Sequence, residues 1–193
     1  DTQSTIPVQS CIDAESYDMS DYIPRVTDYY TVKKALWPMP FNVSNPVLYY
    51  DQNAFTAAGL DPAKPPTTLP QVAAYARRIK ATGQYTYGFG LKLDPWYVEQ
   101  MSGLAGAPYV NNGNGRVGRA TAATFDNPTG LSVFTWMNDM VKSGVAVTNS
   151  ASGPSAFDNL LGIRSKTNGM TIDSSGALGT ISQVLASGEA GGV

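Results

Sequence analysis

Residues 36–60 read LWPMPFNVSNPVLYYDQNAFTAAGL, and this stretch decides the fold. Prolines at positions 38, 40 and 46 lack a backbone donor and favour extended backbone before them. The run therefore fits an edge or crossover strand and hardly a central one. A buried run at 47–50 then leads into a short helix that Asp51 caps and Gly59 ends. The stretch predicts a strand that crosses between two bodies of the protein.

The rest of the chain alternates between helical and extended patterns. Residues 68–71 form a capping box with a proline in the first turn, which predicts a helix with one apolar face that ends at Gly83. The other expected elements are a hairpin over 29–32 and 35–39, a strand over 85–92, helices over 95–106 and 128–144, a loop over 149–155, a short helix over 157–161, a strand over 169–173 and a last helix over 176–185.

Composition narrows the class of protein. The chain has 193 residues, of which 42% are hydrophobic and 15% charged, and this suits one globular domain or one large lobe. Its 13 basic and 15 acidic residues include no basic run, so we expect neither a nucleic-acid surface nor a polybasic membrane patch. No apolar run is long enough to span a membrane, and no signal peptide or lipid-attachment cysteine opens the chain. We expect a small ligand, and a lipid anchor only outside this chain.

The sequence lacks the residues that several kinds of catalytic and metal-binding sites need. The chain has no histidine, and Cys11 is its only thiol, so it cannot build a Ser-His-Asp or Cys-His relay. Only oxygen-ligand metal sites remain, and no calcium-loop spacing of carboxylates is present. Gly113, Gly115 and Gly118 match a dinucleotide-binding pattern, but polar residues precede them and no helix is expected to open on them, so the match indicates chance. We expect no enzyme, metal or cofactor.

A family resemblance rests on residues 40–83. They read PFN-x-S-x-PVLYY, then AF-x-x-AGLDP-x-x-PP-T, and then the helix that ends at Gly83. This pattern resembles the extracellular solute-binding proteins, family 1, of ABC importers, in the branch for sugars and, most closely, sn-glycerol-3-phosphate. The resemblance implies an α/β protein with a periplasmic-binding-protein-like type II fold. Of its two lobes, this chain would be mainly the second, C-terminal one.

The same resemblance implies a division of the chain. Residues 1–42 would be the end of the first lobe and the approach to the hinge. Residues 43–193 would be the second α/β lobe, which stops before the chain returns to the first lobe. The remaining parts of a two-lobed binding site would then lie outside this sequence.

Small residues mark the first candidate site. MTIDSSGAL, residues 170–178, is a strand that breaks at Ser174, Ser175 and Gly176 just before a helix. A ligand can approach free backbone N–H groups at the positive end of such a helix, and the two hydroxyls can add hydrogen bonds. The alternative is that one serine simply caps the helix, and with two serines both uses are compatible. The family resembled presents a similar Ser-Gly turn to its ligand.

Aromatic residues mark the second candidate site. Trp96 follows a predicted strand on the first turn of a helix, where its plane can support the C–H face of a sugar or glycerol chain. The alternative is that it packs within its own lobe. Its position resembles that of a ligand-stacking tryptophan in the family, although glycerophosphate binders have two tryptophans in this loop. Tyr97 and Asp94 are weaker candidates.

A third candidate lies at the crossover. Ser44, in the run PFNVSNP, matches a ligand-contacting serine of the glycerophosphate-binding branch. Asn42 is a weaker candidate, because asparagines in such a turn more often satisfy local backbone groups.

The function implied by the resemblance is binding, not catalysis. The intact protein would be an extracytoplasmic substrate-binding protein, in the periplasm or as a cell-surface lipoprotein, that closes on a polyol, sugar or glycerophosphate and docks on ABC permease subunits. One alternative is a carbohydrate-active enzyme that uses two carboxylates among Asp94, Glu99 and Asp173. Another is a sensor or adhesin that reuses the binding fold.

Overall fold

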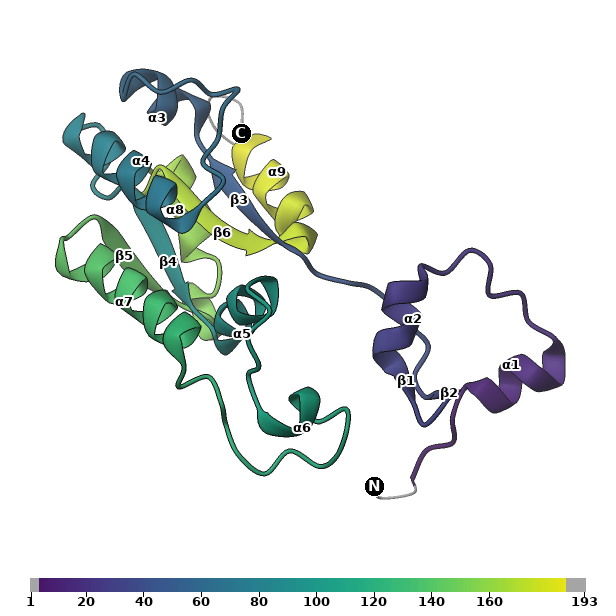
Figure 1. Ribbon diagram of the computed structural model, residues 1–193. Helices are drawn as coiled ribbons and strands as arrows, with labels where there is room; N and C mark the ends of the chain where they lie inside the picture. The colour runs from purple at the N-terminus through teal and green to yellow at the C-terminus, as the bar shows by residue number, and fades with distance from the viewer. Residues whose placement is uncertain (1–3, 187–193) are drawn as a thin grey trace. The chain divides into compact units, whose positions relative to one another are not determined.

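The computed structural model describes residues 4–186, and the chain divides into two units, residues 1–44 and 45–193. The first unit contains α1 (Gln9–Glu15), α2 (Pro24–Tyr30) and a hairpin of β1 (Thr31–Val32) with β2 (Ala35–Leu36) (Figure 1). The φ angles of Lys33 and Lys34 are 51° and 67°, which suits a two-residue hairpin turn. The predicted hairpin is present but shorter than expected, because the helix that Pro24 starts extends through Tyr30.

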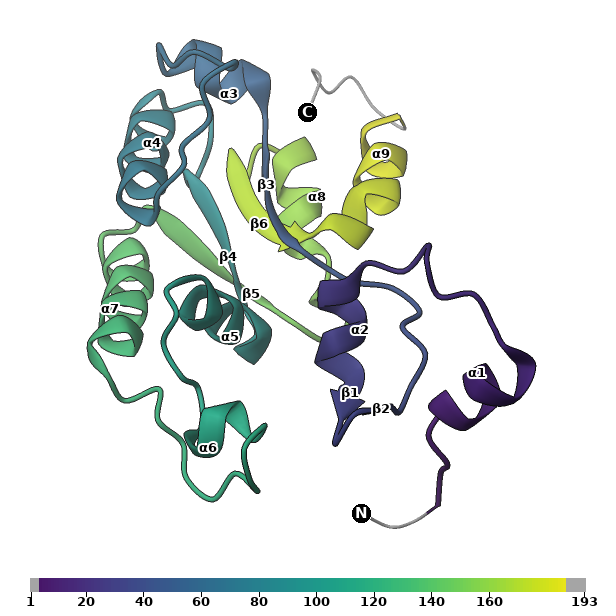
Figure 2. The ribbon, with the colours of Figure 1, turned by 45° about the vertical axis from the view of Figure 1, so that its right-hand side comes forward.

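The second unit is a four-stranded sheet with helices on both faces (Figures 1 and 2). Its strands are β3 (Pro46–Tyr50), β4 (Phe89–Leu93), β5 (Ala146–Ser150) and β6 (Met170–Ser174). Its helices are α3 (Gln52–Ala57), α4 (Leu69–Ala81), α5 (Pro95–Leu104), α6 (Asn111–Asn114), α7 (Pro128–Lys142), α8 (Asp158–Arg164) and α9 (Leu178–Ala186), with 3-10 turns η1 (Gly153–Ser155) and η2 (Ser175–Ala177).

The strand order in the sheet is β3-β6-β4-β5. Strand β4 runs parallel to β5 and β6, whereas β3 runs antiparallel to β6 with Pro46 opposite Ser174. The carboxyl ends of the three parallel strands therefore lie at the same end of the sheet. This end, the carboxyl edge of the sheet, also contains the start of β3. Among the described residues β3 is an outer strand, as its proline predicts.

Each face of the sheet has its own apolar core. Strand alternation turns Phe89 and Leu91 toward α4 and α7, where the larger core cluster also contains Phe55, Ile79 and Met140. The smaller cluster joins β3 to the helices of the other face through Tyr49, Leu160, Ile163 and Ile181. Figure 2 shows α4, α5 and α7 on one side of the sheet and α8 and α9 on the other.

Three predicted elements need correction. Strand β4 begins at Phe89 and not at Tyr85, because Tyr85 turns inward to hydrogen-bond Asp51. The predicted loop over 149–155 begins too early, because residues 146–150 form strand β5, which the sequence does not predict and which pairs with distant β4. The last helix is preceded by the turn η2, so regular α-helix starts at Leu178.

A buried phenol–carboxylate contact fixes the start of α3. Asp51 Oδ1 accepts a hydrogen bond from Asn53 N at 2.8 Å, and its Oδ2 accepts one from the Tyr85 hydroxyl at 2.6 Å. We expect Tyr85→Phe to lower the free energy of unfolding by about 1.5–3 kcal/mol, because a buried carboxylate loses a donor. Urea unfolding measures it. Tyr75→Phe is the control, because that hydroxyl makes only a long, exposed bond of 3.3 Å to Lys64 O. Equal losses in the two variants would contradict this role.

Candidate functional site

The carboxyl edge of the sheet brings two of the predicted sites together in one unit. Asp94 and Trp96 follow β4. Ser174 is the last residue of β6, and Ser175 and Gly176 follow it. Ligands of α/β sheets commonly bind at the carboxyl ends of the strands. Ser44 and Asn42 end the other unit, so their place relative to this edge stays a prediction.

The turn after β6 is held by local hydrogen bonds. Ser174 N donates to Asp173 Oδ1 at 2.7 Å, and Gly176 N donates to Ser174 Oγ at 3.0 Å. Ser175 N donates to Asn45 O at 2.7 Å, and Ser175 Oγ accepts from Asn45 N at 3.2 Å. The predicted free N–H groups at these three residues are therefore already used, because short polar side chains compete for local backbone groups. The Ser175 hydroxyl, as an acceptor, keeps its own proton to donate.

The start of α5 presents an aromatic pair. Asp94 caps the helix, with its Oδ1 accepting from Trp96 N at 2.9 Å. Trp96 is partly exposed, and its ring meets the Tyr97 ring edge-on with centroids 5.0 Å apart. Tyr97 is only 6% exposed. The exposed part of the indole can therefore serve as a stacking surface, whereas Asp94 has a structural role as a cap.

A buried polar cluster lies beneath this edge. Lys92 Nζ is 3.1 Å from Asp173 Oδ2, and the two side chains are only 12% and 7% exposed. Asn159 Nδ2 donates to the same oxygen at 2.8 Å. Sequence reasoning did not predict this cluster. The signal in the sequence was a lysine near the end of β4 and an aspartate near the end of β6, two strands that are otherwise largely apolar.

The Asp173 carboxylate also acts on two tyrosines. Burial raises the pKa of Tyr97 well above its usual range, and the nearby charge of Asp173 raises it further. Burial and then the charge of Asp173 raise the pKa of Tyr49, whose hydroxyl donates to Ser174 O at 2.9 Å. Both phenols therefore remain protonated hydrogen-bond donors at neutral pH.

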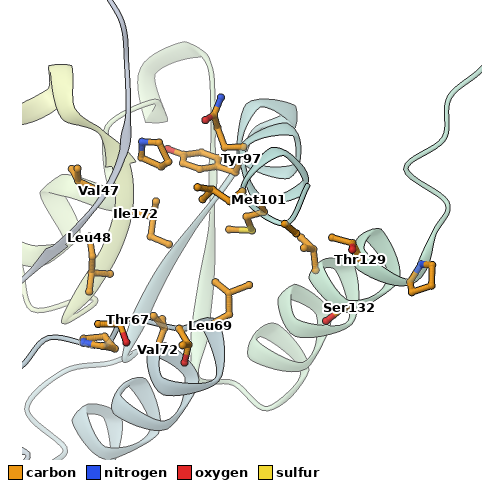
Figure 3. A pocket seen from close by; sticks show the side chains of 18 residues that line it. Val47, Leu48, Thr67, Leu69, Val72, Tyr97, Met101, Thr129, Ser132 and Ile172 are labelled. Carbon is orange, nitrogen blue, oxygen red and sulfur yellow. The ribbon is translucent and has the colours of Figure 1, made fainter. Parts of the chain in front are cut away.

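An apolar groove of about 810 Å³ lies on the α4, α5 and α7 side of the sheet (Figure 3). Side chains from β3, β6, α4, α5 and α7 point into it, among them Leu48, Val72, Met101 and Ile172. Of the predicted ligand residues only Tyr97 lines it. The lining is mainly apolar and includes a few polar side chains, among them Thr67, Gln100 and Thr129, as is common in small-molecule sites.

The three carboxylates of the enzyme alternative lie in different settings. Asp94 caps α5 and Asp173 is in an ion pair, whereas Glu99 is exposed on α5. Within residues 4–186 no three histidine, cysteine or acidic residues are grouped so as to hold a metal ion. In the same part of the chain, no helix combines the length and apolar character needed to cross a membrane.

Comparison with known sequences identifies the family. The family model of bacterial extracellular solute-binding proteins matches residues 4–188. The sn-glycerol-3-phosphate-binding periplasmic protein UgpB of Pectobacterium atrosepticum is 37% identical over 132 residues, which cover 67% of this chain and 30% of that protein. UgpB of Escherichia coli K12 is 36% identical over 131 residues, with 66% and 30% covered. The chain thus matches less than a third of the length of these relatives.

Solved structures show the same fold. The GacH receptor of Streptomyces glaucescens, solved unliganded and with acarbose, superimposes with a TM-score of 0.74 at 17% identity, covering 95% of this chain and 44% of that one. UgpB of Mycobacterium tuberculosis in complex with glycerophosphocholine gives a TM-score of 0.74 at 16% identity, covering 93% and 44%.

These likenesses confirm the predicted α/β, periplasmic-binding-protein-like fold, and the family match confirms the predicted extracytoplasmic location. The chain belongs to the bacterial extracellular solute-binding protein family.

Proposed function

We propose that this chain is the second lobe and hinge of a two-lobed substrate-binding protein that delivers a sugar or glycerophosphate to an ABC permease. Relatives that share 37% and 36% identity with it are named for binding sn-glycerol-3-phosphate. Structural neighbours were solved with glycerophosphocholine and with acarbose, which is consistent with either ligand type.

The observation that carries the proposal is the pairing of an aromatic surface with a serine turn at one sheet edge. Trp96 supplies the flat apolar surface that a sugar ring or glycerol chain packs against. We expect Ser175 and Gly176 to supply a small, hydroxyl-bearing surface beside it, because β4 and β6, which precede the two groups, are neighbouring parallel strands. Tyr97 and Ser174 support these two groups, Asp94 orients the indole, and Ser44 with Asn42 would contribute from the hinge.

We infer that the intact protein binds its solute without catalysis, by closing two lobes on it. The two lobes of such a protein close when a ligand contacts both, so one lobe alone should bind poorly.

Calorimetric titration of the intact two-lobed protein tests the proposal. The panel is glycerol-3-phosphate, glycerophosphocholine and di- and trisaccharides. We expect one of them to bind, and Trp96→Ala to weaken that binding tenfold or more, or about 1.4 kcal/mol, because the stacking surface is lost.

The control is Phe134→Ala, which removes an exposed aromatic ring from the middle of α7, away from the sheet edge. Equal binding by the Trp96 and Phe134 variants would remove Trp96 from the site. If the folded protein binds no member of the panel, the proposal of a sugar or glycerophosphate ligand is refuted. Hydrolysis of a glycoside would instead support the carbohydrate-active enzyme. A solute-binding protein that captures no permease would favour a sensor or adhesin.

A further inference from the structure

We propose that Lys92, Asp173 and Asn159 form a buried polar hub that positions the Ser174–Gly176 turn and the first turn of α5 for solute binding. The hub residues act through their neighbours and do not touch the solute. The inference rests on the proposed function, because it explains how the proposed contact groups are held.

The hub connects four elements through one carboxylate. Asp173 Oδ2 accepts from Lys92 Nζ of β4 at 3.1 Å and from Asn159 Nδ2 of α8 at 2.8 Å. Its Oδ1 accepts from Ser174 N at 2.7 Å, which fixes the first residue of the turn. The Tyr97 phenol of α5 lies close enough to the same carboxylate for its charge to raise the phenol pKa. Both groups of proposed ligand contacts are thus tied to Asp173.

The next shell of contacts secures the hub itself. Asn159 also donates to Thr171 Oγ1 at 3.1 Å, and the Thr171 hydroxyl donates to Gly90 O at 2.8 Å, which links β6 to β4. Lys92 Nζ lies 5.8 Å from the centre of the Phe157 ring. Asn159 and Thr171 are fully buried. These contacts place donors on both oxygens of the Asp173 carboxylate, whereas Asn159 Oδ1 is buried without a hydrogen-bond partner among the described residues.

Burial of the ion pair argues for positioning over stabilisation. A buried pair loses hydration, and an apolar pair of similar size is often as stable. Removing one partner leaves an unpaired buried charge, whereas removing both does not. Stability and solute affinity should therefore respond differently to single and double substitutions.

The test uses the intact two-lobed protein and the panel solute that binds the wild type. We expect Lys92→Met and Asp173→Asn each to lower both the melting temperature and the affinity, the latter at least tenfold. In Lys92→Met/Asp173→Asn the melting temperature should recover while the affinity stays at least tenfold weak. Lys92→Arg, which keeps the charge and its donors, should bind within threefold of the wild type.

Two further variants keep the test decisive. Asn159→Leu cannot remove a solute contact, since Asn159 is fully buried, yet it should weaken binding at least threefold. Lys64→Met, which breaks the exposed 3.4 Å pair with Asp61, should change nothing. If the single variants do not fold, the double variant and Asn159→Leu decide.

The outcomes separate the inference from the proposed function. Suppose that the wild type binds a solute and that the double variant and Asn159→Leu bind it with the same affinity. This result would overturn the hub and leave the proposed function standing. A wild type that binds no solute of the panel would overturn both.

Discussion

Gly88→Ala should lower the free energy of unfolding by about 3 kcal/mol or more. A Cβ at Gly88 would lie 1.9 Å from the backbone oxygen of Ala76 and 2.4 Å from its carbonyl carbon. Ala76 is fully buried in α4, so no flexible side chain can move aside. The helix itself would have to shift away from the sheet, which would open the larger core.

The control for this prediction is a glycine with open space. A Cβ at Gly103, inside α5, meets nothing within 4 Å. Gly103→Ala should raise stability by up to about 1 kcal/mol, because alanine loses less backbone entropy in a helix. Denaturant unfolding measures both variants. A Gly88→Ala protein as stable as the wild type would show that α4 does not pack on β4 as closely as described.

Gly176→Trp should weaken solute binding by the intact protein about a hundredfold, or about 2.8 kcal/mol. Gly176 is exposed in the turn after β6, so a tryptophan there would fill the space proposed for the solute without entering the core. The melting temperature should change little. Calorimetry with the solute that binds the wild type gives the affinity.

A neighbouring glycine provides the matched control. Gly179 is exposed three residues further along, in the first turn of α9, with nothing within 4 Å of its Cβ. Gly179→Trp adds the same bulk to the same region, and we expect binding within twofold of the wild type. Undiminished binding by Gly176→Trp, or equal losses in both variants, would contradict a solute site at the turn.

Local signals predicted the elements that depend on local chemistry. Asp51 and Thr68 cap their helices as the sequence indicates, with side-chain acceptors for Asn53 N and Gln71 N. Pro46 predicted an outer strand, and β3 lies at the edge of the described sheet. Such signals act within a few residues, so a single sequence contains them in full.

Elements that depend on distant partners were harder to predict. Strand β5 has one larger apolar residue, Val147, among small and polar ones, and its parallel pairing with β4, more than fifty residues away, makes it a strand. The pairing of Lys92 with Asp173 likewise follows from strand order, which no local pattern contains. At Ser174–Gly176 the sequence indicated a turn but not that its N–H groups were already occupied.

The most direct test of the proposed solute site is a crystal structure of the intact protein with the panel solute that it binds. We expect the solute to lie between the lobes, with its apolar face on Trp96 and a hydrogen bond from Ser175. A solute bound elsewhere, for instance in the apolar groove beside Val72 and Met101, with Trp96 and Ser175 free of it, would contradict the account.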